Sequence, residues 1–201
     1  MMRINAFTRK CVNLTRQRKS TLSCFLSETK ARLSRVARDD HVVFIMGNQA
    51  ADADSVVSAL VLSYVKSLND RKSLYVPLVS ASRDIFVNTH PLEPFLLRPA
   101  VEVKELIFLE DVIDMMKDLN NDKKMEIVLT DHNKLAPGLH EAFGDAVVEI
   151  YDHHADQNCY EGVRVRKVVF DEKTCSGLGS CCTILGSLAN VEKICGNTEN
   201  E

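Results

Sequence analysis

The chain has 201 residues, of which 45% are hydrophobic, and its formal net charge is −3. This length and hydrophobic content predict one domain with one sizeable core. The slightly negative charge argues against a nucleic-acid-binding protein that works by bulk electrostatics, although it leaves room for a local basic channel. No apolar run approaches the length of a membrane span, which predicts a soluble protein. Seven cysteines without a Cys-x-x-Cys pair indicate a reduced intracellular compartment.

The first 38 residues are rich in basic side chains and hold one acid, Glu28. Residues 1–19 predict a basic tail, either disordered or a mitochondrial targeting segment, because such segments are rich in Arg and Ser and poor in acids. Targeting is the less favoured of these two interpretations. The expected location is therefore the cytoplasm, with the mitochondrion as the alternative. Residues 20–38 predict a helix that belongs to the fold, and its apolar face carries Leu22, Phe25, Leu26, Leu33 and Val36.

The stretch 47–55 follows the apolar run 42–46, which predicts a short strand buried on both faces. An amphipathic helix comes next, with apolar residues at three- and four-residue spacing. This order places Asp52, Asp54 and Ser55 at the carboxyl end of a strand, where open α/β sheets bind their ligands. Two carboxylates there suggest a divalent metal site. The alternative is a helix N-cap with the other acids solvated.

The middle of the chain predicts further strands over 74–79 and 106–109 and a helix over 112–119. Two later strands end in polar clusters as the first one does. The run 127–130 leads into Asp131, His132 and Asn133, and the run 147–151 leads into Asp152, His153 and His154. The carboxyl ends of parallel strands meet at one edge of a sheet, so we expect the three clusters to converge. A satisfied core histidine explains one such cluster but not all three.

The last part of the chain predicts a strand over 163–170 and then a Gly-rich turn that opens a helix within 175–185. Glycines before the start of a helix expose backbone amides that can hold an anion. Here the turn contains Gly179 and Ser180.

Asp152-His153-His154 is the motif that gives the DHH phosphoesterases their name, and the chain resembles this family in three of its four motifs, in order and at similar spacing. The stretch 47–55 and Asp131-His132-Asn133 resemble the branch of yeast-type exopolyphosphatases and prune-like proteins. Asn48 stands where family II pyrophosphatases and RecJ-type nucleases usually carry histidine. The resemblance implies an α/β fold whose mostly parallel sheet has five to six strands, with helices on both faces. This domain would cover 20–190, followed by a polar tail over 191–201.

The resemblance also implies a site for two divalent metal ions, Mg, Mn or Co. Asp131 would bridge the two ions, Asp52 would hold one, and Asp54 with His153 would hold the other. With Asn48 in place of histidine, the first ion site would either be weaker or prefer harder ions such as Mg or Mn. His154 would act as a proton donor or phosphate partner beside His153 and Asp131. Asn48, Asp152 and His132 would orient the metal ligands without binding an ion themselves. Phosphate would contact Ser55, Gly179 and Ser180.

The implied activity is metal-dependent cleavage of phosphoanhydride bonds, as in an exopolyphosphatase that releases terminal phosphate from inorganic polyphosphate. Pyrophosphate is the alternative substrate. The family's fourth motif, an acid within an Asp-Thr pair, and its C-terminal substrate domain are expected to be absent from this chain. A second interpretation is therefore a catalytically impaired module of the same fold that binds a metal or a partner. We expect neither nucleic acid nor a membrane among the partners.

Overall fold

The structure is a computed structural model that describes residues 21–37, 40–89, 101–171, 173–174 and 176–188. The tails that the sequence predicts over 1–19 and 191–201 lie outside the described residues.

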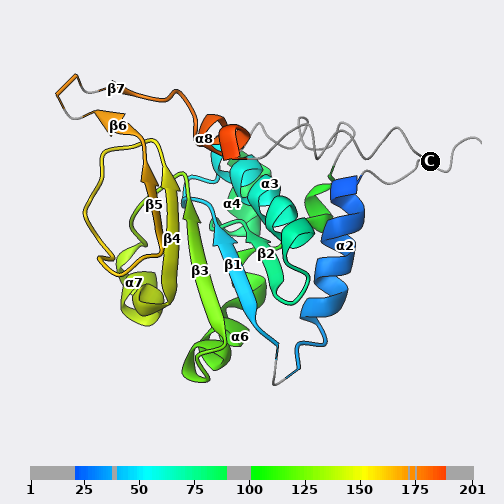
Figure 1. The fold of residues 1–201 in the computed structure, drawn as a ribbon. Coiled ribbons are helices and arrows are strands. Elements are labelled where there is room, and N and C mark those ends of the chain that lie inside the picture. The colour runs from blue at the N-terminus through cyan, green and yellow to red at the C-terminus, as the bar shows by residue number, and fades with distance from the viewer. Residues whose placement is uncertain (1–20, 38–39, 90–100, 172, 175, 189–201) are drawn as a thin grey trace, which may run out of the picture.

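A five-stranded parallel sheet forms the centre of the molecule (Figure 1). Its strands run in the order β2-β1-β3-β4-β5, and each neighbouring pair is parallel. The predicted α/β fold with a parallel sheet of five to six strands is thereby confirmed. A separate antiparallel pair, β6 and β7, follows the sheet. The strands are β1 (Val42–Met46), β2 (Leu74–Leu78), β3 (Met125–Thr130), β4 (Val147–Asp152), β5 (Val165–Val168), β6 (Phe170–Asp171) and β7 (Ser176–Gly177).

Helices cover both faces of the sheet, as predicted (Figure 1). One face packs against α6 and α7, and the other packs against α3 and α8. A third apolar cluster joins α2, α3 and α4. The helices are α2 (Thr21–Leu33), α3 (Ala53–Asn69), α4 (Arg83–Thr89), α6 (Leu109–Asn121), α7 (Pro137–Phe143) and α8 (Cys181–Leu188), with 3-10 turns at η2 (Val103–Glu105) and η3 (Gly144–Ala146).

Strand β1 shows why its sequence is continuously apolar. Side chains alternate between the two faces of a strand, and here both faces are covered by helices. Phe44 packs in the cluster that contains α6 and α7, whereas Val43 and Ile45 pack in the cluster that contains α3 and α8. All five residues of β1 are consequently buried.

The segment 106–109 differs from its prediction as a strand. Only Phe108 pairs, through a single parallel bridge to Val79. Asp111 then accepts a hydrogen bond from the Phe108 amide through Oδ2, at 3.1 Å. This contact at the start of α6 turns the chain into a helix at Leu109. Local capping by an acid therefore replaces the expected continuation of the strand.

The predicted strand over 163–170 is interrupted. It forms β5 and β6 with Val169 between them, and the Val169 amide donates to the Asp152 carbonyl at 2.9 Å. The chain thus leaves the main sheet beside the end of β4. Among the described residues, Cys24, Cys159, Cys181 and Cys182 are free thiols. Within the same part of the chain, every helix is too short or too polar to cross a membrane.

Candidate metal centre

The turn after β1 is shaped by a close approach between Gly47 and Ser55. A Cβ atom at Gly47 would overlap the Ser55 hydroxyl and lie 3.0 Å from the Ser55 carbonyl oxygen. A side chain at position 47 would therefore displace the Ser55 hydroxyl and crowd the backbone of Ser55. The buried Ser55 hydroxyl accepts a hydrogen bond from the Asn48 amide at 2.6 Å. Ser55, a predicted phosphate contact, therefore holds the turn together.

Asn48 links this turn to the next strand. Its side-chain oxygen accepts from the Ala51 amide at 3.0 Å, and its Nδ2 donates to Oδ2 of Asp131 at 2.7 Å. Asp52 is the N-cap of α3, because its Oδ1 accepts from the Ser55 amide at 3.0 Å. The N-cap interpretation thus describes this contact of Asp52, whose side chain is otherwise exposed at the edge of the site.

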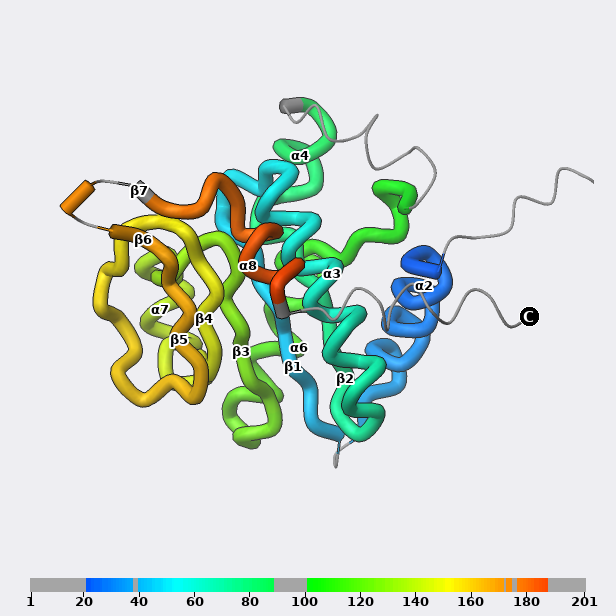
Figure 2. Tube along the Cα trace, turned by 45° about the horizontal axis from the view of Figure 1, so that its top comes forward, coloured from blue at the N-terminus to red at the C-terminus, as the bar shows by residue number. Residues whose placement is uncertain are grey.

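Asp54 reaches from α3 to the start of α8, two helices that lie side by side in Figure 2. Its carboxylate accepts from the Ser180 hydroxyl at 2.7 Å and from the amides of Cys181 and Cys182 at 2.7 and 3.0 Å. Burial alone would raise the pKa of Asp54, but these hydrogen bonds outweigh burial and lower it. Ser180, a second predicted phosphate contact, is therefore engaged with a carboxylate, and the exposed Gly179 precedes it.

Asp131 lies at the end of β3, and only 2% of it is exposed. Its φ of 63° is in the left-handed region, which Asp tolerates better than most residues. Burial, followed by the charges of Asp54 and Asp52, raises the pKa of Asp131 from its ordinary value to about 7. So much crowded negative charge is typical of a position that a cation stabilises.

The two ring nitrogens of His153 face opposite kinds of surroundings. Nδ1 lies 2.8 Å from the Leu178 carbonyl oxygen, which can only accept a hydrogen bond, so Nδ1 carries the proton. In the neutral ring, Nε2 then points a lone pair at Oδ1 of Asp131, 3.1 Å away, and at Oδ2 of Asp54, 3.5 Å away. Three electron-pair donors this close to one another repel unless a proton or a metal ion lies between them. These residues consequently fit a divalent metal ion.

His154 stands beside this group, and its ring centre lies 4.2 Å from that of His153. Donor atoms of Asp131, His153 and His154 all lie within 4.8 Å of one another. Nδ1 of His154 is 2.8 Å from Oδ1 of the fully buried Asp152. Burial lowers the pKa of His154, but the hydrogen bond and charge of Asp152, together with the other nearby carboxylates, raise it overall. The side chain of His154 is 57% exposed, so its ring is accessible to a ligand.

Asp152 is a shared support for the third motif. Its Oδ1 accepts from the His153 amide at 2.8 Å as well as from His154. Its Oδ2 accepts from Nδ2 of the buried Asn133 at 2.5 Å. Asn133 had no predicted role, although it belongs to the same motif as Asp131. Its place two positions after Asp131, in the same polar cluster, was the available signal.

The side chain of His132 has different surroundings from that of its neighbour Asp131. Its Nδ1 lies 3.0 Å from the Thr130 carbonyl oxygen, and burial lowers its pKa. Its side chain lines a cavity of about 340 Å³ together with Asn48, Ser80 and Lys134. Its predicted support of Asp131 stays a prediction.

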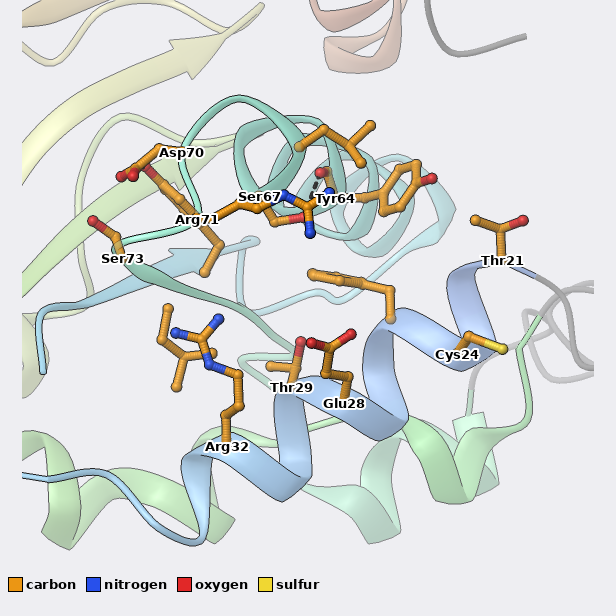
Figure 3. Close-up of a pocket in the computed structure, with 14 residues that line it drawn as sticks. Thr21, Cys24, Glu28, Thr29, Arg32, Tyr64, Ser67, Asp70, Arg71 and Ser73 are labelled. Atoms are coloured by element: carbon orange, nitrogen blue, oxygen red, sulfur yellow. Dashed lines mark hydrogen bonds between the residues drawn. The ribbon is translucent and has the colours of Figure 1, made fainter. Parts of the chain in front are cut away.

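A larger cavity lies away from the predicted site residues. It measures about 460 Å³ and lies between α2 and the end of α3, as Figure 3 shows. Arg32, Tyr64, Arg71 and Tyr75 are among its lining residues, and none of the predicted site residues lines it. The size of a cavity therefore does not locate the candidate site here; the chemistry of the strand ends does.

The fold and the site together define a class, α/β proteins that gather Asp and His side chains at the carboxyl edge of a parallel sheet. The edge lies at a topological switch point, because β1 has β2 on one side and β3 on the other. Residues 42–201 match the DHH family, N-terminal domain, and the chain belongs to this family.

Several curated relatives match the chain at about 30% identity. Exopolyphosphatase PRUNE1 of Rattus norvegicus is 31% identical over 68% of this chain and 29% of its own length. Exopolyphosphatase PRUNE1 of Bos taurus is 30% identical over 80% of this chain and 33% of its own length. A Schizosaccharomyces pombe protein with the provisional name exopolyphosphatase is 28% identical over 71% of this chain and 34% of its own length. The chain thus spans about a third of the length of these relatives.

Proposed function

We propose that this chain is a divalent-metal-dependent phosphohydrolase that releases terminal phosphate from inorganic polyphosphate. One observation carries the proposal. Nε2 of His153 lies 3.1 Å from Oδ1 of Asp131 and 3.5 Å from Oδ2 of Asp54, so one nitrogen and two carboxylate oxygens gather where a divalent cation would be stabilised. Membership of the DHH family supports the choice of a phosphoester or phosphoanhydride as the substrate.

Asp131, His153 and Asp54 would hold one ion, and Asp52 with Asp131 would hold a second. Carboxylate oxygens suit Mg and Mn, and an imidazole nitrogen among the ligands also favours borderline ions such as Co. Such ions supply neutralisation of the phosphate charge and activation of water near neutral pH. Asn48 already donates to Asp131 through Nδ2, so it would fix the carboxylate that both ions share.

His154 would supply the proton for the leaving phosphate. Asp152 holds its Nδ1, so Nε2 is the nitrogen left to face a substrate. The raised pKa of His154 keeps the ring protonated closer to neutral pH. Asp152 is itself held by Asn133, and this buried chain of contacts would orient the donor without touching the substrate.

Two features support polyphosphate as the substrate. Asn48 stands where the pyrophosphatases of the family usually carry histidine, and relatives in three species have exopolyphosphatase in their names. Pyrophosphate is the alternative. A cytoplasmic location, with the mitochondrion as the alternative, stays a prediction.

A second candidate function is a binding module that keeps the fold with little or no catalysis. The carboxylates of Asp52 and Asp54 are both engaged with backbone amides, Asp52 at the start of α3 and Asp54 at the start of α8. Asp54 would have to share both of its oxygens with the start of α8, and Asp52 would have to share Oδ1 with the start of α3. Such sharing favours weak metal sites over a strongly bound pair.

Phosphate release by the purified chain tests the proposal. Polyphosphate and pyrophosphate are offered with Mg, Mn or Co to wild type, to Asp131→Ala and to Asp118→Ala, an exposed acid on α6 that serves as the matched control. We expect metal-dependent release that Asp131→Ala loses and Asp118→Ala keeps. Release that survives in Asp131→Ala contradicts the site. Metal binding without release from either substrate supports the binding module.

A further inference from the structure

The segment 177–182 contacts two of the proposed metal ligands at once. The Leu178 carbonyl oxygen lies 2.8 Å from Nδ1 of His153, and the Ser180 hydroxyl and the amides of Cys181 and Cys182 donate to Asp54. These two ligands come from different parts of the chain, the end of β4 and the start of α3. One short stretch of backbone therefore touches both.

The contact with His153 fixes the chemical form of its ring. A free neutral imidazole places its proton on either nitrogen, and only the form protonated at Nδ1 presents a lone pair at Nε2. A carbonyl beside Nδ1 selects this form, because it accepts a hydrogen bond and cannot donate one. In this form the lone pair is directed toward Oδ1 of Asp131 and Oδ2 of Asp54, which lie 3.1 and 3.5 Å from Nε2, before any ion binds.

Gly177 allows this approach. A Cβ atom at Gly177 would lie 2.7 Å from the Val169 carbonyl oxygen and 2.9 Å from the His153 carbonyl oxygen. Both are backbone atoms, so neither can move aside as a flexible side chain would. The register of the hairpin, with Gly177 opposite Phe170, puts the chain in this position. Any larger residue at 177 would push the backbone, and Leu178 with it, away from His153.

We propose that Gly177 is a positioning residue that holds the Leu178 carbonyl against His153, so that the ring offers Nε2 to the metal site before an ion binds. The proposal takes its metal site from the proposed function, but it does not depend on which phosphate compound is cleaved. It adds the hairpin of β6 and β7 to the parts that build the site.

The ring form of His153 is the first readout. The full chain, labelled with ¹⁵N at histidine and freed of metal, is studied at pH 8.5 by NMR spectra that distinguish a protonated from a bare ring nitrogen. Loss of signals in His153→Gln identifies the ring. We expect wild type to carry the proton at Nδ1. A ring protonated at Nε2 in wild type overturns the proposal without the need for any further variant.

The second readout is Mn²⁺ affinity, measured by calorimetry on Gly177→Ala and on Gly162→Ala. The two changes are matched, because a Cβ at Gly162, outside the segment 177–182, would meet nothing within 4 Å. We expect Gly177→Ala to lose the single ring form and to bind Mn²⁺ about tenfold more weakly or worse. Gly162→Ala and Leu178→Ala, which keeps the backbone carbonyl, are expected to match wild type in both readouts.

A folded Gly177→Ala that keeps the ring form and binds Mn²⁺ within twofold of wild type would refute the positioning role. Neither readout involves a substrate. A chain that binds Mn²⁺ through a fixed His153 and releases no phosphate therefore refutes the proposed hydrolysis and leaves this inference standing.

Discussion

At the scale of single residues, Asp131 concentrates the strain of the site. It is buried, it has a left-handed backbone conformation, and it faces Asn48 and His153 within 3.1 Å. Burial of the carboxylate and the left-handed backbone conformation each cost free energy in a protein without a bound cation, and the hydrogen bond from Asn48 offsets part of that cost. The site is therefore built at some expense of stability, which should be visible when metal is removed.

We expect the metal-free protein to lose stability between about pH 4 and pH 7. The folded pKa of Asp131, about 7, lies above its ordinary value of 3.8, so the folded state binds more protons over this range. The free energy of unfolding therefore falls as pH rises, until Asp131 is ionised in both states. Asp131→Asn removes this term and should melt a few degrees higher than wild type at pH 8 in EDTA.

Melting temperatures in EDTA at pH 5 and pH 8 measure the effect, with Asp118→Asn as the exposed control. If Asp131→Asn loses as much stability as wild type between these pH values, the carboxylate of Asp131 is not the source of the loss.

Gly47→Ala should disrupt the turn that presents Asn48. Its Cβ would overlap the Ser55 hydroxyl, which already accepts from the Asn48 amide. We expect a loss of about 1–3 kcal/mol in the free energy of unfolding. Urea denaturation measures the loss. The control is Gly186→Ala within α8, where a Cβ meets nothing within 4 Å and alanine should add about 0.5–1 kcal/mol. Equal stability of the two variants contradicts the proposed tight turn.

At the scale of elements, the backbone amides at the start of α8 find their hydrogen-bond acceptor in an acid that is far away in the sequence. The first amides of a helix need acceptors, and here Asp54 of α3 supplies two oxygens. Ser180 adds its hydroxyl to the same carboxylate. The packing of α8 on α3 therefore depends on charge as well as on apolar residues such as Ile184.

Ser180→Ala should weaken this junction. It removes the 2.7 Å hydrogen bond to the ionised Asp54, and bonds of this type contribute about 1.5–3 kcal/mol. Because the site is partly open to solvent, we expect a loss near the lower end, about 1–2 kcal/mol, in urea denaturation. Ser187→Ala is the comparison, since the Ser187 hydroxyl donates to the Ile184 carbonyl of its own helix. A Ser180→Ala variant as stable as Ser187→Ala would show that the junction carries little energy.

At the scale of the whole molecule, a metal ion should stabilise the folded chain by an amount that rises with the logarithm of its concentration relative to its dissociation constant. An ion at a hundred times its dissociation constant adds about 2.7 kcal/mol to the free energy of unfolding. We therefore expect Mn²⁺ to raise the melting temperature of wild type and Asp118→Ala, and to leave Asp131→Ala nearly unchanged. A similar rise in all three proteins would place the bound ion elsewhere.

Much of this architecture could be predicted because it follows from sequence patterns that span only a few residues. The apolar run of β1 and the polar clusters at the ends of β3 and β4 are short-range patterns, and parallel pairing brings them to one edge. The strand predicted at 106–109 could not be corrected from its own residues, because Asp111 further along the chain starts α6. The partners of Asp54 lay even further away, since Ser180 follows it by 126 positions. Sequence spacing locates the acids but not the amides that compete for their oxygens.

The bond between Asp54 and the Cys181 amide joins positions 127 residues apart. Closing so long a loop costs more entropy than forming the local turns, so we expect this contact to form late in folding. A growing chain would already hold Asp52, Asp54 and Asp131 well before residue 182 is available to complete the site. High-affinity metal binding would then require the complete fold and not the sheet alone. Mn²⁺ added at successive times during refolding would therefore measure when the contact between Asp54 and Cys181 forms.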